Sequence, residues 1–408
     1  MKNLLILFFL CLCLSLTKAQ TTVGLVAYYP FNSSYADVTG NTANAGVQSG
    51  DPSFACGISG GALFLDGIDD KVSYLGPLIQ EFDTEDFTVS FYFKATITSA
   101  TRYLLSKRSR DCKSENAFYI RYVPQTRTIN CFLGEDQSKS VTFIQKLDDS
   151  ACWYQLTLTR QGTKVTLYIN GKLVQELFTN SRVNILNDGP LVLGSSECRS
   201  SNEASFAGLI DEFRVYNRAL TEKEARELYA APDMIQNRDT LLFLGSSVQI
   251  NVPTTCASSF SWEPLDGVAP PVVANPVITP NQAGAIVYKI FFYDNISPCV
   301  ATDTIRLNVV DPNSLDCNTI FLPKAFTPNG DGLNETFGIS NPFALQQLIS
   351  FEIFDRWGGR VFATNDPFAR WDGAANGQAV NSGVMLYRIR YICQGEEKVI
   401  AGSVTIMR

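Results

Sequence analysis

Carboxylates are the side chains that could carry acid–base chemistry in this sequence, because its 408 residues include no histidine. The absence excludes Ser-His-Asp and Cys-His nucleophiles and imidazole-ligated zinc. Two carboxyl groups about 5 to 5.5 Å apart could still hydrolyse a glycosidic bond with retention. Asp211 and Glu212 are adjacent, so on a strand they would point to opposite faces. A second group, Asp83, Glu85 and Asp86, lies in a polar stretch typical of a solvated loop. We therefore expect no catalysis, with a glycoside hydrolase or lyase as the alternative.

Length and charge restrict the class of protein further. The chain is two to four times the usual domain length of about 100 to 200 residues, which predicts several domains. Asp and Glu number 40 against 33 Lys and Arg, so a nucleic-acid partner is disfavoured. Plentiful Tyr, Phe and Gly with only four Met favour antiparallel sheets over helical bundles. We expect an all-β protein.

The N-terminal residues predict export. Lys2 precedes an apolar run from Leu4 to Leu14, and Ala19 offers a small residue at a plausible cleavage point, which is typical of a signal peptide over residues 1–19. The run is too short to span a bilayer, and no later stretch is apolar enough. We therefore expect a mature chain without a transmembrane span.

The cysteines indicate disulfides. Two of the 11 lie in the leader, and the remaining nine form no CxxC pair. In an oxidising compartment they are expected to pair, with at least one left unpaired or joined to another chain. Spacing suggests that Cys256 pairs with Cys299, and Cys317 with Cys393, each within its own module.

The other five cysteines all precede residue 231, and their pairing stays open. We hypothesise that Cys112 pairs with Cys198, because both lie in polar loops that the strand pattern places at one end of a sandwich.

Short strands separated by turn signals fill the block that follows the leader. The clearest pattern covers residues 164–176, where alternating apolar residues flank Asn170-Gly171, the signal of a type I′ hairpin turn. Residues 86–94 and 152–160 repeat the period of two. One helix is predicted after Thr221, which forms a capping box with Glu224, and Pro232 ends it.

Ordered motifs cover this block, residues 20–231. They run from AYYPFNSSYADVTG through GALFLDGIDDKVSY, CWYQLTLTR, LYINGKLV and LVLGSS to FAGLIDEFRVYNRALTEKEARELY. In this order they resemble the laminin-G-like, concanavalin A-like sandwich of bacterial surface proteins. The resemblance implies a jelly roll of two antiparallel sheets. It also implies a ligand, frequently carbohydrate and sometimes protein, on the concave face or loop rim, and often a calcium ion. The Glu-x-Asp-x-x-Glu arrangement of the fold's laminarinase-like enzymes is absent.

The last block, residues 314–408, contains FLPKAFTPNGDGLNETF, IFDRWGGRVF, WDGAANG and SGVMLYRIRY. These motifs resemble the gliding-motility-associated C-terminal domain, the type B sorting signal of type IX secretion, which implies a small β-sandwich. The matching residues are Asn329, Asp331, Trp357, Gly358, Trp371, Asp372 and Gly373. The implied partner is the type IX secretion machinery, and the implied location is the outer cell surface of a gram-negative bacterium or the medium.

The middle block, residues 232–313, resembles the Ig-like, PKD-like spacers that often precede such a signal. The resemblance depends on Cys256, Trp262, Cys299 and Thr302-Asp303-Thr304.

Calcium is the expected cofactor, in a structural role. Hard cations take six to eight oxygen ligands, which loops between strands can supply without imidazole. The candidate ligands, which coincide with acidic positions of the laminin-G-like motifs, are Asp37, Asn41, Asp66, Asp69 and Asp211. The alternative is that Asp66 and Asp211 only cap turns by accepting backbone N–H bonds.

Binding of a sugar requires an aromatic platform and a few fixed polar groups. Tyr103 or Tyr119 is the candidate platform, whereas Phe91, Phe93 and Trp153 are expected in the core. The candidate rim consists of loop residues, namely Arg108, Arg110, Lys113, Asn116, Arg199 and Asn202. We expect an exported binding protein whose partner is a glycan, with a surface protein as the alternative.

Overall fold

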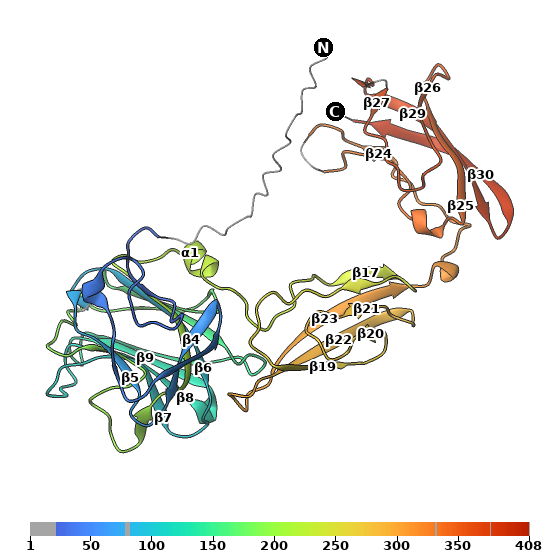
Figure 1. Ribbon diagram of the computed structural model, residues 1–408. Helices are drawn as coiled ribbons and strands as arrows, with labels where there is room; N and C mark the ends of the chain where they lie inside the picture. Colours follow the sequence, from blue (N-terminus) through green and yellow to red (C-terminus); the bar gives the residue numbers. More distant parts are fainter. Residues whose placement is uncertain (1–21, 78–81, 331–332, 376, 408) are drawn as a thin grey trace, which may run out of the picture. The chain divides into compact units, whose positions relative to one another are not determined.

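The computed structural model describes residues 22–77, 82–330, 333–375 and 377–407 (Figure 1). The predicted signal peptide lies outside these residues. The expected all-β class is confirmed, because strands dominate the described chain. By its contacts the chain divides into two compact units. The first contains residues up to 238, 248–278 and 287–306, and the second contains 239–247, 279–286 and 307–408.

Two eight-stranded sheets form a sandwich in the first unit, drawn in blue to green in Figure 1. One sheet has the order β13 (Lys172–Phe178), β12 (Lys164–Ile169), β11 (Tyr154–Gln161), β6 (Phe87–Ala95), β16 (Ala207–Tyr216), β4 (Gly60–Asp66) and β3 (Ser53–Gly57), with β1 (Leu25–Tyr29) on β16. The other has the order β10 (Ser140–Lys146), β9 (Thr128–Gly134), β8 (Ala117–Val123), β7 (Thr101–Lys107), β14 (Leu191–Leu193), β5 (Lys71–Tyr74) and β2 (Val47–Ser49), with β15 (Glu203–Ser205) on β7.

The core of the sandwich lies between these sheets. Phe91 and Phe93 are buried in it, as predicted from the alternation along β6. Trp153 is also buried, but it packs in a separate small cluster with Tyr92 and Leu209. Alternating strand residues therefore leave the opposite face of each sheet for other contacts.

The local signals of the sequence are confirmed. Asn170 and Gly171 have φ values of 51° and 69°, as a type I′ turn between β12 and β13 requires. The helix α1 covers Glu222–Glu227, and its capping box joins Thr221 and Glu224 in both directions. Short 3-10 helices lie at Thr42–Asn44, Pro124–Thr126, Pro312–Ser314 and Pro342–Ala344.

Two of the three hypothesised disulfides are confirmed, and one is wrong. Cys112 bonds Cys198 and Cys317 bonds Cys393, with Cα atoms 5.2 and 5.5 Å apart. Cys256 and Cys299 do not bond each other. The former bonds Cys56 and the latter bonds Cys152.

The physical reason is that residues 248–278 and 287–306 pack on the first sandwich. Ser297 donates to the Ala95 carbonyl, and Thr302 donates to the Ser150 carbonyl at 2.8 Å. The buried ammonium of Lys94 pairs with Asp294. Among the described cysteines, Cys131 alone lacks a disulfide. It is buried in the core, so it is not a link to another chain.

Strands of the middle block form two small sheets. One has the order β17 (Thr240–Phe243), β23 (Ala301–Val310), β22 (Gly284–Tyr293) and β19 (Ser259–Glu263). The other has the order β18 (Val248–Gln249), β21 (Val277–Ile278) and β20 (Val268–Ala269). Trp262 is buried and donates to the Val273 carbonyl.

A five-stranded sheet forms the second unit's main layer. Its order is β24 (Ala325–Phe326), β30 (Glu396–Ile406), β29 (Gly383–Cys393), β25 (Gln347–Phe354) and β26 (Arg360–Thr364), and β27 (Ala374–Ala375) pairs with β28 (Gln378–Ala379). Trp371 is buried and forms an isolated antiparallel β-bridge with Phe337. Its indole N–H donates to the Ala374 carbonyl at 2.7 Å.

The remaining motif residues of this unit form turns. Asp372 accepts from the Ala374 amide, and Gly358 and Gly373 have positive φ. Trp357 is 87% exposed. Asn329 donates its backbone N–H to the Thr327 carbonyl. Asp331 lies outside the described residues. In the part of the chain that the structure describes, no helix is long and apolar enough to cross a membrane.

Candidate ligand-binding site

The strands β7, β8 and β9 turn one face away from the core, and aromatic and cationic side chains line it. Tyr119 and Arg121 are two residues apart on β8, so they share this face. The strand register places Phe132 of β9 beside Tyr119, and Tyr103 of β7 beside Arg121. Their neighbours Phe118, Ile120 and Leu133 point into the core, as the alternation requires.

The rings of Tyr119 and Phe132 are stacked, with centroids 5.0 Å apart and planes at 19°. The Arg121 guanidinium lies 4.7 Å from the Tyr119 centroid, within cation–π range. Gly134 makes room for the Phe132 ring, because a Cβ at Gly134 would lie 2.7 Å from the Phe132 Cζ atom. The glycine thus permits an aromatic ring to lie against the sheet.

A carboxylate fixes the cation of this group. Glu203 on β15 forms an ion pair with Arg121, and it accepts hydrogen bonds from the Tyr103 hydroxyl at 3.3 Å and the Ser200 amide at 2.9 Å. Burial opposes its charge, but the hydrogen bonds from Ser200 and Arg121 outweigh burial, and the pKa of Glu203 is lowered. Tyr103 is only 1% exposed, so it cannot be the stacking platform, and Tyr119 remains.

A cleft of about 610 Å³ opens beside the stacked pair. Tyr119 and Phe132 supply its apolar wall. Its polar lining includes Arg108, Glu115, Asp136, Gln137, Ser138 and Ser140. Hydrogen bonds from the Ser138 hydroxyl and the Lys139 amide hold the pKa of Asp136 below its usual range.

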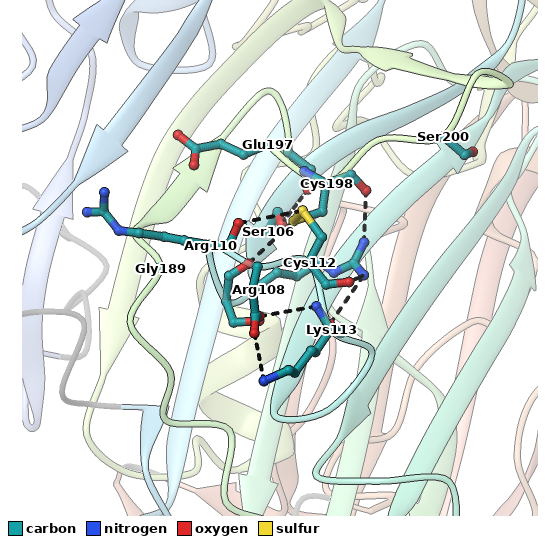
Figure 2. The surroundings of a disulfide bond; sticks show 12 residues. Ser106, Arg108, Arg110, Cys112, Lys113, Gly189, Glu197, Cys198 and Ser200 are labelled. Atoms are coloured by element: carbon teal, nitrogen blue, oxygen red, sulfur yellow. Dashed lines mark hydrogen bonds and ion pairs between the residues drawn. A yellow bond between two sulfur atoms is a disulfide. The ribbon is translucent and has the colours of Figure 1, made fainter.

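The disulfide Cys112–Cys198 holds the loop that borders this cleft (Figure 2). Arg108 donates to the Cys198 carbonyl at 2.9 Å and to the Cys112 carbonyl at 3.4 Å. The Nε atoms of Arg108 and Arg121 are buried without a hydrogen-bond partner. Arg108 therefore fixes the loop and leaves one donor unused.

A second cleft, of about 560 Å³, lies beside the same loop. Arg110, Lys113 and Asn116 line it, as does Asp188. Arg110 donates its amide to the Asp188 carboxylate and its Nε to the Asp188 carbonyl. The Asn116 side chain donates to the Asn184 carbonyl at 2.8 Å, which secures the wall of the cleft.

Two predicted rim residues line neither cleft. Arg199 donates to the Ser205 hydroxyl, and Asn202 is exposed. Three residues of the group were not anticipated from sequence: Phe132, Arg121 and Glu203. The alternation in the string AFYIRYV could have identified Arg121, since Tyr119 and Arg121 alternate with Phe118 and Ile120.

The predicted calcium ligands are in three places. Asp66 and Asp69 lie together with Asp70, with one carboxylate oxygen of each within 4.8 Å of the others. Asp70 accepts from the amides of Asp51 and Asp66. Asp66 also accepts from the Ile68 amide, as the turn-cap alternative expects.

The other candidates have separate local roles. Asp37 accepts from the Tyr28 and Thr39 amides, and Asn41 caps the 3-10 helix at Thr42–Asn44. Asp211 is fully buried and accepts from the Ile58 amide at 2.6 Å, and burial raises its pKa to about 8.

Of the carboxylates weighed for catalysis, those of Asp211, Glu212 and Asp86 are engaged in local hydrogen bonds or an ion pair. Glu212 pairs with Arg214 and accepts from the Tyr28 hydroxyl, whereas Asp211 accepts from the Ile58 amide. The expectation of opposite faces is wrong, because Ile210 and Phe213 both pack in the core and a bulge between Asp211 and Arg214, with Glu212 at a φ of 55°, leaves both carboxylates on the outer face of β16. Near the start of β6, Asp86 accepts from the Gly162 amide. The backbone carbonyls of Asp83 and Glu85 accept from the Arg160 guanidinium.

Comparison with known families defines the class of two segments. Residues 66–226 match the profile of the Concanavalin A-like lectin/glucanases superfamily, and residues 320–406 match that of the CHU_C Type IX secretion signal domain. The chain therefore carries a concanavalin A-like domain followed by a type IX secretion signal domain. The second domain indicates export to the cell surface or the medium.

Among individual proteins, Paraclostridial mosquitocidal protein 1 of Paraclostridium bifermentans is 35% identical over 91 residues, which are 22% of this chain and 7% of that protein. The solved binding domain of Paraclostridial Mosquitocidal Protein 1 is similar over 92% of this chain and 89% of its own, with 15% identity and a TM-score of 0.45. Domain 4 of AbnA, a GH43 extracellular arabinanase from Geobacillus stearothermophilus, solved with arabinotriose, is similar over 50% of this chain and 98% of its own, with 22% identity and a TM-score of 0.35.

Proposed function

We propose that this protein is an exported, non-catalytic binding protein that holds a glycan in the cleft beside Phe132. The observation that carries the proposal is the stacked pair Tyr119–Phe132, which gives an apolar wall to an otherwise polar cleft. A pyranose ring has an apolar face and a rim of hydroxyl groups, so it is suited to one aromatic wall and several polar ones. Ligand sites combine these two elements in general.

The polar lining supports a neutral, hydroxyl-rich ligand. Gln137 offers both donors and an acceptor, and Ser138 and Ser140 offer hydroxyls that can do either. The charges of the cleft are mixed, because Arg108 lines it together with Glu115 and Asp136. The cleft therefore carries charges of both signs, and its electrostatic field does not favour a strongly charged ligand.

The carboxylates of the cleft support binding without catalysis. A glycosidase needs one carboxyl group whose pKa is raised, so that it is a proton donor near neutral pH. The hydrogen bonds to Asp136 shift its pKa in the opposite direction. Asp211 has a raised pKa, but its side chain is fully buried and accepts from the amides of Ile58 and Glu212.

The proposal also includes a location, which follows from the secretion signal domain, and a cofactor, which follows from the cluster of acidic residues. The type IX machinery would deliver the protein to the outer surface of a gram-negative bacterium or to the medium, where glycans or surface proteins are accessible. A structural calcium ion is proposed at Asp66, Asp69 and Asp70, whose hard oxygen donors suit that ion.

A polysaccharide panel tests the function. Affinity electrophoresis of the protein in gels that contain each polysaccharide should show retardation by at least one of them, without new reducing ends in solution. Phe132→Ala should weaken that binding at least tenfold, about 1.4 kcal/mol. The matched control is Phe178→Ala, which removes an exposed ring from the other sheet and should bind like the wild type.

Two results would contradict the proposal. Product release by the wild type, lost in carboxylate variants, would make the protein a hydrolase or lyase. Binding on a protein array but to no polysaccharide would make it a protein-binding adhesin.

A further inference from the structure

We propose that the ligand is an oligosaccharide chain that occupies both clefts, passing over the loop of residues 109–115 that separates them. The proposal rests on the glycan-binding function and adds the form of the glycan. The loop carries Cys112, which is bonded to Cys198 (Figure 2), and residues of this loop line both clefts.

The two clefts adjoin. Glu115 lines both of them, and the loop supplies Ser114 to the first cleft and Ser109 to the second. Their volumes of about 610 and 560 Å³ each lie within the range of about 300–1,000 Å³ that small-ligand sites occupy. One sugar ring would leave most of this combined space to water, whereas a chain of rings would fill both parts.

The chemistry of the two clefts differs in a way that suits consecutive sugars. The first has the aromatic wall of Tyr119 and Phe132. The second has no aromatic side chain, and its lining is polar apart from Leu186. The first cleft is therefore the anchor that stacks on a ring, and the second adds hydrogen bonds to the sugars that follow. Arg110 extends away from the disulfide (Figure 2) and adds guanidinium donors to the lining of the second cleft.

The separating loop is held rigidly before any ligand binds. The disulfide holds the middle of the loop at Cys112, the Arg108 guanidinium donates to the carbonyls of Cys198 and Cys112, and Asp111 pairs with Lys113 at 2.7 Å. On the far wall, Asn187 donates to the Asn116 carbonyl. A wall that is already ordered costs little entropy on binding, so added sugar units should contribute affinity directly.

Chain length is the measurable consequence. We would titrate the full chain by calorimetry with cello-, xylo-, chito- and arabino-oligosaccharides of two to six units. For the series that binds, the six-unit chain should bind at least tenfold more tightly than the two-unit chain. Arg110→Ala should bring that ratio close to one. Phe132→Ala should weaken both lengths by a similar factor and keep the ratio.

The matched control is Arg182→Ala. Arg182 is also an exposed arginine that donates to a backbone carbonyl, that of Thr84, and it lines neither cleft. It should leave the ratio unchanged.

Failures of the two proposals can be told apart. Binding that does not depend on length, or a ratio unaffected by Arg110→Ala, overturns the two-cleft proposal and leaves the glycan-binding function standing. The absence of binding at every length in all four series overturns both.

Discussion

Removal of the disulfide between Cys112 and Cys198 should lower both the stability of the first unit and its affinity for a glycan. The bridge closes a loop with a sequence separation of 86. In the chain-entropy treatment, a loop of that size loses about 15 cal/mol/K in the unfolded state, or about 4.6 kcal/mol at 25 °C. Native strain and residual structure usually reduce the effect, so we expect a loss of about 2–4 kcal/mol.

The double variant Cys112→Ser, Cys198→Ser is the test, because it leaves no new thiol to react with others. The matched control is Cys317→Ser, Cys393→Ser, whose bridge in the second unit has a separation of 76. The entropy of that loop differs by only about 0.1 kcal/mol. Scanning calorimetry should show a lower melting temperature for the first unit in the test variant, and a lower melting temperature for the second unit in the control.

Affinity distinguishes the two variants. Loss of the bridge at Cys112 should free the loop between the clefts and weaken binding of the longest oligosaccharide at least tenfold, whereas the control should bind normally. An unfolding free energy unchanged within about 1 kcal/mol would refute the entropy argument. Unchanged affinity in the test variant would refute the role of the loop in binding.

Four further predictions concern other parts of the chain. Millimolar calcium should give heat in calorimetry and raise the melting temperature of the wild type but not of Asp69→Asn; a wild type that gives no heat contradicts the calcium proposal. Because the pKa of Asp211 is raised to about 8, the folded state holds more protons than the unfolded state between about pH 4 and pH 8, so the free energy of unfolding should fall as pH rises through this range. Lys94→Met leaves the Asp294 carboxylate buried without its cation and should cost about 3–5 kcal/mol in urea unfolding. Truncation before Asp316 should block export, and unchanged surface display would show that the C-terminal domain is not the signal.

Two controls make these tests specific. Asp211→Asn removes the titrating group, so its stability should change less between pH 5 and 8, and parallel curves would contradict the assignment. Lys164→Met breaks an exposed pair with Glu176, which should cost less than about 1 kcal/mol. If it cost as much as Lys94→Met, burial would not be the reason for the larger effect.

Local sequence signals anticipated much of the first sandwich. The turn at Asn170-Gly171 requires two positive φ values that few residue pairs adopt, and the capping box at Thr221 depends on contacts within one helical turn. Such features depend on neighbours in sequence, so the residue types alone specify them. The hypothesis that Cys112 meets Cys198 succeeded because strand alternation located both loops at one end.

Features that depend on how distant segments pack were missed. The proposed bond of Cys256 to Cys299 assumed that the middle block folds alone, and no local pattern reveals that its residues pack on the first sandwich. Phe132 was missed because its place beside Tyr119 depends on the register of β8 and β9. Asp70 was not predicted together with Asp66 and Asp69, because only the folded chain shows that its carboxylate is buried close to theirs.

The bonds from Cys56 to Cys256 and from Cys152 to Cys299 impose an order of events on biosynthesis. Cys56 is the first cysteine after the predicted signal peptide, yet its partner is made 200 residues later, after four other thiols, those of Cys112, Cys131, Cys152 and Cys198. Oxidation between nearest neighbours would join Cys56 to Cys112 and trap the chain in a non-native connectivity. If oxidation begins before Cys256 is available, thiol–disulfide exchange must undo such early bonds, and the yield of native protein should then depend on an isomerase in the compartment where it folds.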